Sequence, residues 1–323
     1  MRRRAFIVGL GGAVAWPMMI GAQEPGRIYR MGWLGFASRN APWNVALINA
    51  LKAEGFVPGQ NLVIDDNGYG LRLDELNGHA SEVVKDRVDV IVSTGEPSIR
   101  AAQVATKTIP IVAIADDMVR SGFVASLGKP GGNTTGVSIL ATDLDGKRQE
   151  ILLEGVPGLH RIAALADTNT TLPQQLQALR NAAQARGVEL LIYRVANAEE
   201  IAGAIDAAKA DGAEALNVLG SVILFNNRQT IVPRVAAHGL PAIYQWPAMA
   251  EEGAFLRYGP RLEQIFRDIM GRQLVKLLRG AKPTEIPVEQ PTKFELAVNV
   301  KAAKALGLTV TESFLLRADK VIE

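Results

Sequence analysis

Apolar stretches and amphipathic stretches alternate along the chain from about residue 30 onward. Short, continuous apolar runs occur at 31–35, 62–64, 88–92 and 109–114. Segments with helical spacing lie between them, at 44–54, 73–84 and 97–105. Continuous apolar strands that alternate with amphipathic helices are typical of a parallel sheet covered by helices on both faces. The first third of the chain is therefore predicted to form an α/β unit.

The same alternation starts again near residue 161, which predicts a second unit of similar architecture. Its apolar runs lie at 161–166, 188–193, 213–219 and 240–244. Its predicted helices lie at 173–186, 198–210 and 227–237. A long helix at 261–278 and a last helix at 300–306 follow. Extended pieces at 137–139, 254–258 and 294–298 are candidates for strands that cross between the two units.

The N-terminal segment has the layout of a secretory signal. Three arginines at positions 2–4 precede an apolar stretch at 5–20 and the small residues Gly21 and Ala22. A glycine-rich stretch at 6–13 imitates a dinucleotide-binding loop, but Pro17 would break the helix that such a loop requires. We therefore expect residues 1–22 to be a signal peptide and the mature protein to be soluble and periplasmic.

Composition excludes several classes of site. The 323 residues suggest about two domains, and they contain no cysteine, so disulfides, thiolate metal sites and a lipid-anchored N-terminal cysteine are excluded. Without residues 1–22 the chain has 32 basic and 33 acidic residues, which gives no sign of a nucleic-acid surface. A phosphate-binding P-loop and a G-x-S-x-G turn are absent, and the three histidines lack partners at ligand spacing. We predict no catalytic residue, no metal and no cofactor.

Polar and aromatic residues follow the predicted strands, where open parallel sheets bind their ligands. In the first unit the candidate ligand-binding residues are Ser38, Asn40, Trp43, Thr94, Gly95, Ser98 and Asp117. In the second unit they are Asn169, Ser221, Asn226 and Trp246. If these two edges face each other across a hinge, they form a cleft.

The stretch VDVIVSTG at 88–95 is the most suggestive of these turns. A helix that begins near Pro97 leaves its first backbone N–H groups free, and such groups suit a carboxylate. Thr94 and Ser98 can add hydroxyl donors, and Gly95 lets a ligand approach the backbone. Alternatively, Thr94 or Ser93 simply caps its own helix. Glu96 weighs against an anion here, so both interpretations stay open.

Several longer motifs carry a resemblance to a known family. They include PGGNTTG at 130–136, GAFLRYGP at 253–260, LLRGAKP at 277–283, IPVEQPTKFEL at 286–296 and NVKAAKALGL at 299–308. Over about residues 30–323 the chain resembles the extracytoplasmic substrate-binding proteins of ABC transporters, in the branch that includes tryptophan and tyrosine binders.

The resemblance implies a type I periplasmic-binding fold, an α/β fold with two doubly wound parallel-sheet lobes. Three crossover strands, near Val137, Phe255 and Glu295, would join them. The first lobe would comprise 28–138 plus about 255–290, and the second 139–254 plus about 291–323. The resemblance supports as ligand-lining positions Ser38, Thr94, Gly95, Asp117, Ser221 and Trp246. Where the family commonly has Asp-Pro-Val, this chain has Asp117-Met118-Val119, so the path of that loop is less constrained.

We therefore expect a receptor that captures a small carboxylate-bearing ligand, such as an aromatic amino acid, by hinge closure. It would act as a monomer, without enzymatic activity, and deliver the ligand to an ABC permease in the inner membrane. The carboxylate would bind at Thr94 and Gly95, the amine near Asp117, and Trp43, Tyr244 or Trp246 would stack on the ligand. The alternatives are a sugar or nucleoside-like ligand, or an enzyme on a doubly wound fold.

Overall fold

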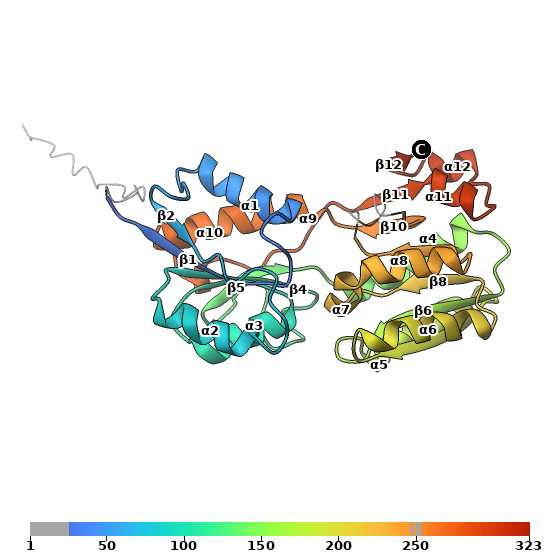
Figure 1. The fold of residues 1–323 in the computed structure, drawn as a ribbon, viewed down its shortest axis with the longest axis horizontal. Coiled ribbons are helices and arrows are strands. Elements are labelled where there is room, and N and C mark those ends of the chain that lie inside the picture. Colours follow the sequence, from blue (N-terminus) through green and yellow to red (C-terminus); the bar gives the residue numbers. More distant parts are fainter. Residues whose placement is uncertain (1–25, 247–248, 250–252) are drawn as a thin grey trace, which may run out of the picture.

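Two lobes, each built on its own sheet, lie side by side along the long axis of the molecule (Figure 1). The computed structural model describes residues 26–246, 249 and 253–323. The predicted signal peptide at 1–22 lies outside the described residues. The α/β architecture with two largely parallel sheets confirms the predicted fold class.

The first lobe contains a five-stranded parallel sheet with the order β2-β1-β3-β4-β5. Its strands are β1 (Tyr29–Leu34), β2 (Leu62–Ile64), β3 (Val90–Thr94), β4 (Ile111–Ala115) and β5 (Thr134–Ser138). The helices between them are α1 (Pro42–Ala53), α2 (Leu76–Lys85) and α3 (Glu96–Ala105). Strands β3 and β4 are buried on both faces, which explains their continuous apolar sequences.

The second lobe contains a seven-stranded sheet with the order β12-β11-β10-β9-β8-β6-β7. All neighbours are parallel except β10 and β11. Its strands are β6 (Arg161–Asp167), β7 (Glu189–Val195), β8 (Ala215–Val218), β9 (Ala242–Tyr244), β10 (Leu256–Gly259), β11 (Glu295–Asn299) and β12 (Lys320–Ile322). Its helices are α4 (Ala141–Gly155), α5 (Pro173–Gln184), α6 (Glu199–Ala210), α7 (Val222–Asn226), α8 (Arg228–Ala237), α11 (Val300–Ala305) and α12 (Glu312–Leu315).

The predicted long helix at 261–278 returns the chain to the first lobe. It consists of α9 (Leu262–Gln264), a π-helical segment η2 (Ile265–Met270) and α10 (Gly271–Leu278), and it packs along α1 (Figure 1). Gly271 makes this approach close, because a Cβ atom there would lie 3.0 Å from the Cβ of Ala50. A short 3₁₀ turn, η3 (Pro283–Glu285), follows the helix.

The chain passes between the lobes three times. It crosses between β5 and α4, between β10 and α9, and between Glu289 and β11. The second crossing lies after Gly259 rather than at Phe255, because β10 pairs with β9 and β11 in the second sheet. Residues 256–259 therefore belong to the second lobe and not, as expected from the sequence, to the first.

Helices α4 and α7, which the hydrophobic pattern did not predict, both bear on function. The inward side of α4 carries the buried polar residues Asp145, Arg148 and Gln149 beside its buried apolar residues, and they interrupt the apolar stripe that identifies a helix in sequence. Helix α7 is only five residues long and has no room for a helical period.

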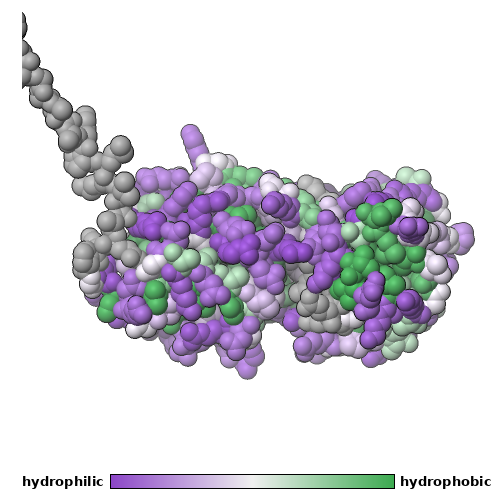
Figure 2. Space-filling view, turned by 90° about the horizontal axis from the view of Figure 1, so that it is seen from above, coloured by the Kyte–Doolittle hydropathy of each residue, from purple (hydrophilic) through white to green (hydrophobic). Residues whose placement is uncertain are grey.

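The surface differs between the lobes. Seen from above, hydrophilic side chains predominate on the first lobe, whereas an apolar patch is visible on the second (Figure 2). In the C-terminal part of the second lobe, Leu316 and Val321 are exposed. Within the described residues, no helix is long and apolar enough to cross a membrane.

Candidate functional site

The carboxyl ends of the strands in the two sheets come together where α7 reaches the first lobe. We call this boundary between the lobes the interlobe seam. Here Gly95, which precedes α3, lies against Val222 of α7, and a Cβ atom on Gly95 would be 2.9 Å from Val222 Cγ2. Gly95 also has a φ of +86°, so a side chain here is disfavoured both by the backbone and by the opposite lobe.

An aromatic contact forms one half of the seam. Phe225 of α7 lies between Trp43 of the first lobe and Trp246 of the second, with ring centroids 5.7 and 6.0 Å apart. The guanidinium of Arg228 lies 4.7 Å from the Phe225 ring centroid. Both tryptophans are only 8% exposed. We call Trp43, Phe225 and Trp246 the aromatic contact, and its geometry shows that the lobes touch in this structure.

Phe225 was not among the predicted site residues, whereas both tryptophans were. Nothing in the sequence around Phe225 distinguishes it from a core phenylalanine. The helix that carries it, α7, was not predicted, so its position at the seam was not expected. The signal that could have found it is its place after β8, at the edge of the sheet where ligands bind.

Four of the predicted polar residues use their side chains locally. Ser98 donates to the carbonyl of Thr94 at 2.9 Å, within its own helix. Asp117 Oδ1 accepts the backbone N–H groups of Val119 and Arg120 at 3.1 and 2.9 Å. The Ser98 bond stabilises the start of α3 and the Asp117 bonds stabilise a turn, so fewer groups of each side chain are left for a ligand.

The second lobe shows the same local use. Ser221 donates to Asp167 at 2.7 Å and caps α7 by accepting the N–H groups of Ile223 and Leu224. Asn169 donates to Asp167 and to the carbonyl of Ala196, both at 3.1 Å. Ser38, Asn40, Asn169 and Asn226 are exposed. The ligand contacts assigned to these residues remain predictions.

The start of α3 resolves one of the open interpretations of the VDVIVSTG stretch. Gly95 is the N-cap residue, and no side chain caps this helix. The interpretation that Thr94 or Ser93 caps its own helix is therefore wrong. The first N–H groups of α3 are not satisfied by a cap, which is the condition for an anion to bind there. Glu96 is held by Ser121, whose hydroxyl donates to it at 2.8 Å.

A buried polar cluster, which was not predicted from the sequence, forms the other half of the seam. Asp145 and Arg148 of α4 are fully buried and form an ion pair, and Gln175 also donates to Asp145. Arg148 further donates to the carbonyl of Tyr258 at 3.2 Å. Burial raises the pKa of Asp145, although the Arg148 guanidinium opposes this shift.

Asp116 completes this cluster from the first lobe. Its backbone carbonyl accepts the N–H of Leu140 at 2.6 Å, so it is attached to the first crossing between the lobes. Burial raises the pKa of the Asp116 carboxyl to about 7, with additional contributions from Asp145 and Glu96. Arg148 and the Gln245 side chain act in the opposite direction. We call Asp116, Asp145, Arg148, Gln175 and Gln245 the polar cluster.

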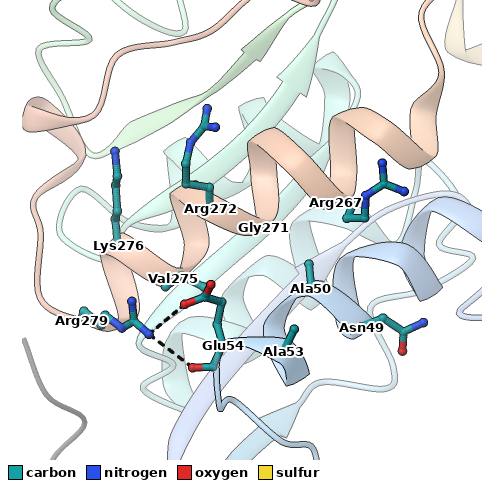
Figure 3. Close-up of a pocket in the computed structure, with 10 residues that line it drawn as sticks. All are labelled: Asn49, Ala50, Ala53, Glu54, Arg267, Gly271, Arg272, Val275, Lys276 and Arg279. Carbon is teal, nitrogen blue, oxygen red and sulfur yellow. Dashed lines mark hydrogen bonds and ion pairs between the residues drawn. The ribbon is translucent and has the colours of Figure 1, made fainter.

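A separate groove lies on the first lobe between α1 and the η2–α10 helix (Figure 3). It has a volume of about 530 Å³. The basic side chains at its rim include Arg267, Arg272 and Arg279, which pair with Asp268, Glu289 and Glu54, respectively. Because these charges are already compensated, the groove is a weaker candidate for a ligand site than the seam.

Comparisons with known proteins agree with this architecture. The family model described as ABC transporter substrate binding protein matches residues 44–322. A tyrosine-binding protein of Clostridioides difficile strain R20291 is 28% identical over 265 residues, which are 81% of this chain and 75% of that protein.

Two solved structures share the fold. A conserved domain protein from Vibrio cholerae superposes with a TM-score of 0.82 at 23% identity, covering 91% of this chain and all of that one. An ABC domain in complex with L-Trp from Streptococcus pneumoniae gives a TM-score of 0.80 at 24% identity, with the same coverage. These similarities confirm the periplasmic-binding fold expected from the sequence.

Proposed function

Since the chain belongs to the family of ABC transporter substrate-binding proteins, we propose that it captures a small carboxylate-bearing ligand, an aromatic amino acid, in the interlobe seam. It then delivers that ligand to an ABC permease in the inner membrane. The protein acts from the periplasm as a monomer, and it makes or breaks no bond in the ligand.

The observation that carries this proposal is the meeting of two sheet edges across three chain crossings. Ligands of open parallel sheets bind at the carboxyl ends of the strands. Here the turn after β3, with Gly95, lies directly against α7, which follows β8. A ligand that touches both edges stabilises the closed arrangement, because only that arrangement makes both sets of contacts.

Two features favour an aromatic carboxylate. The uncapped start of α3 offers backbone N–H groups to a carboxylate. The aromatic contact offers three rings, and aromatic rings pack favourably at centroid distances of roughly 4.5–7 Å. A relative that binds tyrosine and a structural neighbour that holds L-Trp support the same ligand class.

The test is thermal unfolding of the purified protein with a panel of L-tyrosine, L-tryptophan, aliphatic amino acids, dicarboxylates, sugars and nucleosides. A ligand that binds only the folded state raises the melting temperature by mass action. We expect a shift with the aromatic amino acids, and its loss in the variant that combines Thr94→Ala and Trp246→Ala. A shift with sugars or nucleosides alone would refute the proposed ligand class and leave the transport role in place.

A further inference from the structure

The polar cluster contains more negative than positive charge. Asp145 is paired with Arg148, a cation that also acts on Asp116, while Glu96 adds a further carboxylate nearby. Asp116 has no salt bridge within the described residues. Asp116 is half-buried. A carboxylate that is partly removed from water without a cationic partner is costly, and this favours uptake of a proton or binding of a cation.

The opposite lobe presents an unsatisfied group at the same place. Gln245 follows β9 and is only 4% exposed. Its amide lies close enough to Asp116 to favour the charged carboxylate, yet Nε2 makes no hydrogen bond of normal geometry within the described part of the chain. A buried amide without a partner is uncommon in native proteins and indicates a missing group. Asp116, which follows β4 of the first lobe, and Gln245, which follows β9 of the second, therefore lie close together.

The geometry points to Asp116 as the residue that binds the ammonium group of the ligand, with Gln245 contacting the ligand from the second lobe. This inference rests on the proposed function and makes it more specific, because it requires the ligand to carry an amine. It also moves the amine contact from Asp117, whose Oδ1 stabilises its own turn, to the preceding residue. A charge-assisted hydrogen bond from the ammonium would supply the positive charge that the polar cluster lacks.

The experiment compares Asp116→Asn with Asp117→Asn in calorimetric titrations with L-tyrosine and with 3-(4-hydroxyphenyl)propanoate, which lacks the amine. For Asp116→Asn we expect the affinity for L-tyrosine to fall about 50-fold, the effect of losing a buried charge-assisted hydrogen bond. The analogue should bind the native protein weakly and should not lose affinity in this variant. Asp117→Asn keeps the oxygen that stabilises its turn and should change the affinity for L-tyrosine less than about threefold.

The native protein provides a second readout that does not depend on the folding of a variant. Because the ammonium pairs with the charged carboxylate, binding should weaken below the pKa of Asp116, about 7. Glu96, Asp145 and Arg148 are the other ionisable groups that act on Asp116. We expect the dissociation constant to rise about 30-fold between pH 8 and pH 5.5. In Asp116→Asn this dependence should be largely absent.

The outcomes separate the inference from the proposed function. Unchanged binding of L-tyrosine by Asp116→Asn, or equal binding of the amine-free analogue, would overturn the role of Asp116 while the receptor function stands. A large loss in Asp117→Asn alone would return the amine contact to Asp117. If no aromatic amino acid binds the native protein, the proposed ligand class fails and the inference fails with it.

Discussion

The two halves of the interlobe seam are built in opposite ways. In the aromatic contact, Trp43, Phe225 and Trp246 satisfy one another, so the lobes can touch there without a ligand. In the polar cluster, within the described residues, Asp116 forms no salt bridge and Gln245 Nε2 makes no hydrogen bond of normal geometry. Apolar contacts are non-directional, whereas buried charges require specific partners. The aromatic contact is therefore suited to closing the lobes, and the polar cluster is suited to selecting what they close on.

The largest expected effect comes from breaking the ion pair that anchors the polar cluster. Arg148→Met leaves Asp145 buried without its cation, which should lower the free energy of unfolding by about 3–5 kcal/mol. For a protein of this size the melting temperature should then fall by roughly 10 °C. Thermal unfolding measured by circular dichroism at pH 7.5 checks this expectation.

The matched control for that variant removes both charges. The double variant Asp145→Asn with Arg148→Met should recover most of the loss, because no isolated charge remains. A single variant that melts within about 2 °C of the native protein would show that the pair contributes no more than a surface ion pair.

A smaller effect is expected where the two lobes touch. Gly95→Ala must adopt a φ of +86° and also meet Val222 across the seam. Gly158→Ala, at the other end of the second lobe's sheet, has a φ of +84° but nothing within 4 Å. Both variants should lose about 1–2 kcal/mol of stability through backbone strain. Only Gly95→Ala should also lower the affinity for L-tyrosine, by about tenfold, because it alone obstructs closure.

Calorimetric titration and thermal unfolding of the same two variants separate strain from obstruction. Equal affinities in Gly95→Ala and Gly158→Ala would mean that the closed arrangement does not bring Gly95 against Val222 when ligand is bound.

Phe225→Ala tests the aromatic contact directly. Each aromatic pair contributes about 0.5–1.5 kcal/mol beyond its buried area. We expect the ligand-free protein to open, so that its radius of gyration in X-ray scattering increases. Its melting temperature should fall less than that of Arg148→Met, because Phe225 is only partly buried. Phe225→Leu keeps apolar area without the ring, so its radius of gyration should lie between those of the native protein and Phe225→Ala. If the radius of gyration of Phe225→Ala is unchanged, the other contacts of the seam hold the lobes closed.

The hydrophobic pattern predicted the layered fold because both sheets follow simple rules. Strands such as Val90–Thr94 and Arg161–Asp167 are buried on both faces and therefore read as continuous apolar runs. Helix α4 follows no such rule. Its inward residues Asp145, Arg148 and Gln149 are the kind that the pattern places on a solvated face, and only the partners from other segments explain their burial.

The same limit applies to the site. Position after a strand identified Trp43, Gly95 and Trp246, which do lie at the seam. It could not show whether Asp116 or Asp117 is available to a ligand, because that depends on which carboxylate accepts the backbone N–H groups of the turn. It could not find Gln245 or Asp145 as partners of Asp116, because they are 129 and 29 positions away in the sequence.

The smallest expected effect concerns stability against pH in the ligand-free protein. The pKa of Asp116 is raised from 3.8 to about 7 in the folded state, so the folded protein binds more protons than the unfolded chain between these values. Stability from this group therefore falls as pH rises through that window, and the charged carboxylate opposes folding most above pH 7.

Asp116→Asn removes this cost and should raise the melting temperature at pH 8 by about 3 °C, with little change near pH 4. Thermal unfolding of both proteins from pH 4 to pH 8 measures it, with Asp117→Asn as the neighbouring control. If the two melting temperatures differed by the same amount at every pH, Asp116 would not titrate in this window. The polar cluster would then need no further partner, like the aromatic contact.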